Sequence, residues 1–335
     1  MTRQRSFLLV ASFALSVVLI AILIKVGRID LRVTLQQLES VRWISFVKLL
    51  LLNVALVAIS TEKWRSIDAA LRRSSDTAQS RSTSFALTSV GLALGTVLPV
   101  QIAMATARTL GTYVHGSAIK RGTAGTLYEQ SFDLLTVAFL AIASGITWLS
   151  KAAGITWLVS AVLLTLLALA IVGPAARLIC WLAAHAARVA AAESRVGVLL
   201  HDFSELLHSS LLSARLARRL VLLSAARFVV VVLMSIQTAE AIGLHIALWH
   251  MAAAIPFVVF ASVIALTPGG LGVNELTAAA ALSFFGTPLA LGAQWTVANR
   301  ILVTVSYLAT AVCAATILLV GKMTASSSRN AVADH

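Results

Sequence analysis

Charged side chains lie inside strongly apolar stretches of this sequence, where each one requires a partner or a ligand. Glu129 and Asp133 are four residues apart, so they share one face of a helix. Two carboxylates placed in this way are suited to binding a cation, carrying protons or holding an arginine. The alternative is a structural position at the membrane surface, with ion pairs to Lys120 or Arg121.

Two arginines are candidates for binding an anion. Arg300 lies deep in an apolar stretch that begins at Leu289, about 16 Å along the axis of a helix. A guanidinium at that depth requires an anion, and the candidates are Glu275 within the chain and the phosphate of a lipid. Arg108, which follows Pro99, could play the equivalent part from the cytoplasmic side. The alternative for both is a structural ion pair, or a side chain that extends to the membrane surface.

The segment 266–275, with the sequence LTPGGLGVNE, separates two apolar stretches. Pro268 lacks a backbone N–H and the following glycines disfavour a helix, so one helix should end near Leu266 and another begin near Asn274. Glu275 then lies in the first turn of the second helix, where the helix dipole favours negative charge. Helices interrupted at membrane depth form substrate sites in transporters. A Pro/Gly turn at the membrane surface is the alternative.

The composition identifies a membrane protein. Hydrophobic residues make up 59% of the chain and charged residues 12%, whereas soluble domains carry about 25% charged residues. The net charge of +13 is concentrated in the linkers between apolar stretches, as expected of orientation signals and of contacts with anionic membrane lipids. No nucleic-acid motif accompanies it, so we expect no nucleic-acid partner. Cys180 and Cys313 have no metal-binding or redox spacing and are expected to be free thiols.

Enzyme signatures are missing from the sequence. It contains no HExxH, GxSxG or Walker motif, and its seven histidines are scattered and lie mostly in linkers. We therefore expect a protein that is not an enzyme and that holds neither a cofactor nor a metal ion.

The apolar stretches predict an all-α polytopic fold with about six full membrane spans. Two further stretches, broken at Pro99 and Pro268, are expected to form re-entrant helical hairpins. Residues 1–320 thus form one transmembrane domain, in which 175–219 is a cytoplasmic amphipathic linker, and residues 321–335 form a disordered tail. The predicted spans are Phe7–Ile24, Trp43–Ser60, Leu127–Leu149, Ile155–Val172, Leu220–Gly243 and Leu289–Val320, and the predicted hairpins are Phe85–Val114 and His250–Phe285.

The distribution of Lys and Arg distinguishes between topologies. If the two hairpins enter the membrane from opposite faces, the basic segments 61–84 and 177–219 and both termini are cytoplasmic. If Phe85–Val114 crossed the membrane instead, the arginines of segment 177–219 would lie outside. Opposed hairpins, each followed by a long helix with buried polar residues, also suggest an inverted repeat. These polar residues are Glu129 and Asp133 in one half, and Gln294, Asn299 and Arg300 in the other.

These motifs resemble the lysylphosphatidylglycerol synthase transmembrane-domain family of flippase-like membrane proteins. The segment 267–275 resembles that family's Pro-Gly-Gly-(Ile/Leu)-Gly-x-x-Glu signature. Pro99 with Arg108, the Glu129–Asp133 pair and the Asn299-Arg300 dipeptide add to the likeness, which spans residues 85–320. The chain departs from the family at Ile102 and Ala103, where Gly and an acidic residue are usual, and at Gln130, where arginine is usual.

The resemblance implies a stand-alone translocase of a bacterial inner membrane, which moves a phospholipid or an isoprenoid-linked glycolipid between leaflets. The soluble aminoacyl-transferase domain of bifunctional members is not expected in this chain. One alternative is a scaffold that presents a lipid to a separate lipid-modifying enzyme, and another is a membrane transferase that uses the paired carboxylates. The expected headgroup site comprises Arg300, Arg108, Asn299, Glu129, Asp133, Glu275 and the backbone of Pro268, Gly269, Gly270 and Gly272.

Overall fold

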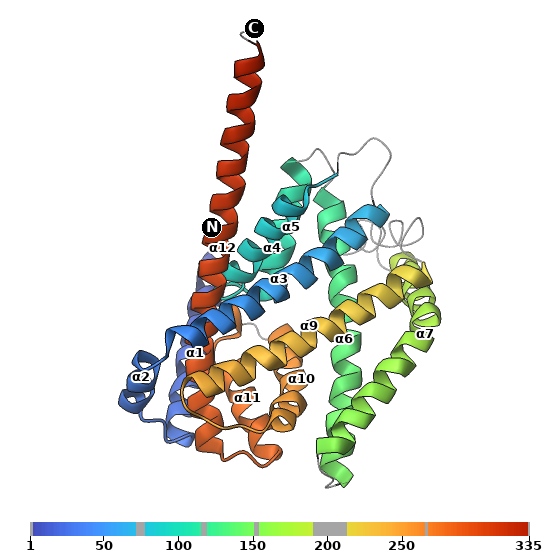
Figure 1. The fold of residues 1–335 in the computed structure, drawn as a ribbon. Helices are drawn as coiled ribbons and strands as arrows, with labels where there is room; N and C mark the ends of the chain where they lie inside the picture. The colour runs from blue at the N-terminus through green and yellow to red at the C-terminus, as the bar shows by residue number, and fades with distance from the viewer. Residues whose placement is uncertain are drawn as a thin grey trace.

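The computed structural model describes residues 3–71, 78–114, 119–150, 154–189, 213–264 and 267–333. Within these residues every regular element is a helix, so the predicted all-α fold is confirmed (Figure 1). The elements are α1 (Arg3–Val26), α2 (Leu31–Glu39), α3 (Trp43–Leu71), α4 (Arg81–Leu94), α5 (Val100–Val114), α6 (Ile119–Ser150), α7 (Gly154–Val189), α9 (Ala214–Ala241), α10 (Leu248–Ile264), the 3₁₀ turn η1 (Pro268–Gly270), α11 (Val273–Phe284) and α12 (Leu289–Ala333).

Among the described residues, α3, α6, α7, α9 and α12 are long and apolar enough to cross a membrane. The 24-residue helix α1 precedes them. Between membrane helices the hydrophobic effect gives little attraction, so small residues that allow close approach and polar side chains that bond across helices hold the bundle together. Gly125 lies against Trp64, where a Cβ would come within 2.9 Å of the indole. Asn53 of α3 donates to the backbone oxygen of Ser306 in α12 over 2.9 Å.

Two helical hairpins interrupt the series of long helices. In the first, α4 packs along α5, and in the second, α10 packs along α11. The 14 residues of α4 span about 21 Å, which is short of the roughly 30 Å core of a bilayer. The breaks fall near the two prolines, since Pro99 and Pro268 each lack the N–H that would continue a preceding helix. Helix α4 ends at Leu94, a few residues before Pro99, and α10 ends at Ile264, close to the predicted end near Leu266. Figure 1 shows the two hairpins pointing into the bundle from opposite ends.

The ends of the helices separate into two sets. The C-terminal ends of α3, α5 and α7 lie toward the end of the bundle where α12 emerges, and the C-terminal end of α6 and the α9–α10 and α11–α12 links lie toward the other end (Figure 1). This is the arrangement predicted for six crossings and two opposed hairpins. Each hairpin precedes a long helix, α6 or α12, as an inverted repeat requires.

Three predicted boundaries differ from the structure. Helix α3 continues to Leu71, eleven residues beyond the predicted end of that span at Ser60. Helix α12 continues to Ala333, where the sequence predicted a disordered tail, because residues 322–333 contain neither Pro nor Gly to stop it. Helix α7 runs through Pro174 to Val189 and so includes the start of the predicted linker. The amphipathic stretch predicted within 190–212 lies outside the described residues.

Candidate functional site

A cavity of about 250 Å³ lies where the tips of the two hairpins meet. Its wall combines the α4–α5 turn, η1 and α11 with the middle parts of α9, α10 and α12. The tips are in direct contact, because a Cβ added to Gly269 would lie only 2.2 Å from the backbone oxygen of Thr96. Two helix breaks that are far apart in the sequence, one beside Pro99 and one at Pro268, thus lie in contact at the centre of the helix bundle.

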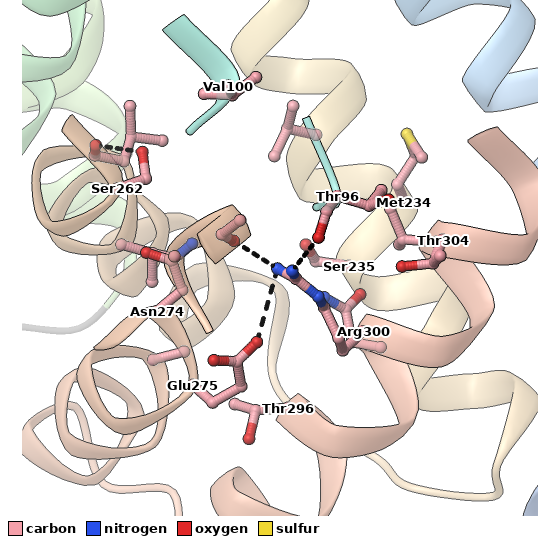
Figure 2. Close-up of a pocket in the computed structure, with 18 of the residues that line it drawn as sticks. Thr96, Val100, Met234, Ser235, Ser262, Asn274, Glu275, Thr296, Arg300 and Thr304 are labelled. Carbon is pink, nitrogen blue, oxygen red and sulfur yellow. Dashed lines mark hydrogen bonds and ion pairs between the residues drawn. The ribbon is translucent and has the colours of Figure 1, made fainter. Parts of the chain in front are cut away.

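Arg300 extends from α12 into the contact between the tips, as Figure 2 shows. Its Nη1 donates a 2.9 Å hydrogen bond to the backbone oxygen of Gly269, and its Nη2 donates a 2.8 Å bond to that of Thr96. One guanidinium therefore joins both hairpins. The side chain remains 26% exposed, so it is still accessible from the cavity.

Glu275 makes two different contacts from the first turn of α11. Its Oε2 accepts a 2.6 Å hydrogen bond from the backbone N–H of Gly272, which caps the helix and satisfies a donor that the helix leaves free. Its Oε1 lies 3.7 Å from Nη1 of Arg300. The pairing of Glu275 with Arg300, which the sequence left open, is therefore present in the structure.

The remaining residues predicted around this segment have different positions. Gly269, Gly270 and Asn299 line the cavity, whereas Pro268 and Gly272 do not belong to its wall. Asn299 accepts a 2.8 Å hydrogen bond from Oγ1 of Thr238, which joins α12 to α9. Sequence analysis missed Asn274, which also lines the cavity and whose buried Oδ1 has no hydrogen-bond partner among the described residues.

A second cavity of about 150 Å³ holds the other predicted group. The guanidinium of Arg108 forms a two-point ion pair with Glu129, with Nη2 and Oε1 3.2 Å apart, and lies 5.0 Å from the centre of the Trp64 ring. Arg108 is only 2% exposed. In this structure it therefore makes the structural ion pair that the sequence offered as the alternative to headgroup binding.

The carboxylates of α6 contact cations from three other helices. Asp133 contacts Nζ of Lys63 and accepts a 3.1 Å hydrogen bond from Nη1 of Arg227. Lys63 is fully buried and also lies 3.7 Å from Oε1 of Glu129. These partners come from α3, α5 and α9, so the predicted helix face is confirmed, whereas the side chains of Lys120 and Arg121, the alternative partners, lie outside what the structure describes.

Lys63 is the main residue that sequence analysis misplaced, since it was assigned to a polar linker. A signal for its true position exists, because Ser60, Lys63, Ile67 and Leu71 recur at helical spacing and all lie on the buried face of α3. The neighbouring polar residue Glu62 falls on the opposite face and pairs with Arg65.

The charged network around the two cavities has one more cation than carboxylate among the residues that the structure describes, and Lys63 belongs to this network without lining either cavity. Four cations contact three carboxylates: Lys63, Arg108, Arg227 and Arg300 against Glu129, Asp133 and Glu275. Burying an unbalanced charge is costly, and a bound anion would compensate it. The electrostatics of the site therefore favour a ligand with a net negative charge.

Long apolar helices around an internal charged cavity define a polytopic α-helical membrane protein with a central polar site. The chain belongs to the family described as the lysylphosphatidylglycerol synthase transmembrane region, whose model matches residues 9–313. No curated protein and no solved structure matches the chain. The family establishes an integral membrane protein related to lipid handling.

Proposed function

We propose that the protein binds the anionic headgroup of a lipid between the hairpin tips and moves that lipid from one leaflet to the other. The observation that supports this proposal is the position of Arg300, a partly exposed guanidinium on a cavity between opposed hairpins. Guanidinium and phosphate form charge-assisted hydrogen bonds, and their planar, two-point geometry gives specificity as well as binding energy.

Glu275 occupies the place of the ligand when no lipid is bound. The 3.7 Å separation from Arg300 is longer than a charge-assisted hydrogen bond, so a phosphate that approaches to a normal distance forms a stronger contact. The amide of Asn274 lies on the same wall and has an unused oxygen, which suits a hydroxyl or ammonium donor on the headgroup. The proposed ligand is therefore a phospholipid or another lipid-linked phosphate.

We also propose that this site lies in a bacterial inner membrane with both termini in the cytoplasm. The positive-inside rule supports this orientation, because the C-terminal ends of α3 and α7, which belong to the basic segments 61–84 and 177–219, lie toward the end of the bundle where α12 emerges (Figure 1). Reporter fusions after residue 335 test it. Activity of a reporter that functions only outside the cytoplasm would contradict the orientation.

The test of the function is leaflet transfer of labelled lipids in vesicles that contain the purified protein. A panel of anionic, aminoacylated and isoprenoid-linked lipids should show headgroup selectivity. Arg300→Ala should slow transfer by about tenfold or more, because it removes a charged hydrogen-bond donor from the site. Arg81→Ala is the matched control, since Arg81 is 77% exposed and lies outside both cavities.

Two outcomes would overturn the proposal. Transfer by folded Arg300→Ala at the rate of the Arg81→Ala control would show that the headgroup does not bind at Arg300. Tight lipid binding without any transfer would instead favour a scaffold that presents the lipid to a separate lipid-modifying enzyme. Co-purification with such an enzyme would then be the next measurement.

A further inference from the structure

Arg227 connects the two cavities. Five residues line both of them: Leu92, Val100, Arg227, Val259 and Ser262. Among the described residues Arg227 is the one charged member of this shared wall. Arg227 therefore borders both the cavity of Arg300 and the cavity of Asp133.

Of the three cations that contact Glu129 or Asp133, Arg227 has the most exposed side chain. Lys63 is fully buried and Arg108 is 2% exposed, whereas the Arg227 side chain is 29% exposed. Among the described residues it forms one ion pair, the 3.1 Å contact to Asp133. Asp133 also contacts Lys63, so this carboxylate keeps a buried cation if Arg227 turns away.

The second cavity lies on the path from the hairpin tips toward one end of the bundle. Its wall includes Gln101, Met104 and Arg108, which lie progressively farther along α5 from the tip of the first hairpin. The C-terminal end of α5 lies toward the end of the bundle where α12 emerges (Figure 1). A headgroup that leaves the central cavity past Arg227 thus moves toward that end.

From this geometry we infer that Arg227 is a second binding position for the headgroup phosphate, to which Arg300 passes the lipid. The inference rests on the proposed function and adds a route and a substrate class to it. The phosphate replaces Asp133 at Arg227, and Asp133 remains neutralised by Lys63. The surplus of one positive charge matches a lipid with a singly charged phosphodiester, as in phosphatidylglycerol.

The inference predicts opposite effects for the two partners of this ion pair. Arg227→Gln should weaken the binding of short-chain phosphatidylglycerol to the detergent-solubilised protein by about tenfold, because a charged donor is lost. Asp133→Asn should strengthen it, because the carboxylate no longer competes with the phosphate for Arg227. Isothermal titration calorimetry measures both affinities.

The double variant Arg227→Gln/Asp133→Asn decides between a ligand contact and a structural ion pair. It removes both charges of this ion pair and leaves Glu129, 3.7 Å away, as the carboxylate that Lys63 contacts, and thermal unfolding verifies that the variant is folded. We expect its affinity to stay about tenfold below that of the wild type and its leaflet transfer to stay slow. Wild-type affinity and transfer in the double variant would overturn the inference and leave the ion pair structural.

Arg300→Ala in the same titration separates failure of the inference from failure of the proposed function. If Arg300→Ala weakens binding while the double variant binds like the wild type, only the position at Arg227 is wrong. If neither Arg300→Ala nor the double variant changes the affinity, the headgroup site between the hairpin tips is itself wrong. A short-chain diacylglycerol, which lacks the phosphate, should not bind in any of these variants.

Discussion

The contact between the hairpin tips makes a quantitative prediction for the variant Gly269→Ala. Gly269 has a φ angle of 57°, in the left-handed region that side chains other than glycine rarely adopt. A methyl group there would lie 2.2 Å from the oxygen of Thr96 and 2.6 Å from Nη2 of Arg300. Because non-bonded heavy atoms need more than 3 Å, the tips must separate by about 1 Å.

The expected loss of stability has two parts. Placing alanine in the left-handed conformation costs about 1–2 kcal/mol. Separating the tips breaks the hydrogen bond from Arg300 to Thr96, and a hydrogen bond to a charged group contributes about 1.5–3 kcal/mol. We therefore expect Gly269→Ala to lower the free energy of unfolding by about 2.5–5 kcal/mol and to reduce lipid transfer.

Two other glycines provide matched controls. Gly243 has a φ angle of 74° and nothing within 4 Å of its added Cβ, so Gly243→Ala carries the conformational cost of about 1–2 kcal/mol without the clash. Gly145 lies within α6 with open space around it, and Gly145→Ala should be neutral or slightly stabilising. Equilibrium unfolding in mixed detergent micelles compares the three variants.

The comparison between Gly269→Ala and Gly243→Ala is decisive. If both variants lose the same free energy of unfolding, the tips do not touch as described and Arg300 does not join them. A loss for Gly269→Ala that exceeds the Gly243→Ala loss, together with an unchanged Gly145→Ala, would support the contact.

Three further variants test the buried polar network by thermal unfolding. Glu129→Gln leaves the buried Arg108 without its anion and should cost about 3–5 kcal/mol. Glu62→Gln, at a half-buried position on the opposite face of α3, should cost about 1 kcal/mol or less, and equal shifts for the two variants would contradict the burial of the Arg108–Glu129 pair. Lys63→Met should cost less than Glu129→Gln, because both carboxylates keep an arginine. Asn53→Ala breaks the bonds from α3 to α12 and should cost about 1 kcal/mol, and an unchanged unfolding midpoint would exclude this role.

The interruptions of the helices were predictable because their cause is local. A missing N–H at Pro268 and the glycines beside it act on the backbone within a few residues, wherever the segment lies in the fold. Helix α11 accordingly begins at Val273, next to the predicted start at Asn274. The shared face of Glu129 and Asp133 was predictable for the same reason, since four-residue spacing is a property of one helix.

The partners of these carboxylates were not predictable, because they depend on which helices are neighbours. Lys63 and Asp133 are 70 residues apart in the chain and meet only through the packing of α3 on α6. Arg227 reaches Asp133 from α9, over 94 residues. Helical periodicity gives the direction of each side chain but does not identify the helix opposite it. The joining of both hairpin tips by Arg300 was beyond prediction for the same reason.

The double contact of Glu275 has a consequence for the affinity of the site. The hydrogen bond from Gly272 holds the carboxylate in place whether or not Arg300 turns toward another anion. Under the proposed function, a lipid phosphate must then compete for Arg300 with the carboxylate of Glu275, which cannot diffuse away. This competition lowers the affinity of the site for the lipid. Weak, reversible binding shortens the lifetime of the complex, and a carrier with a short-lived complex can release its cargo on either side of the membrane without an input of energy.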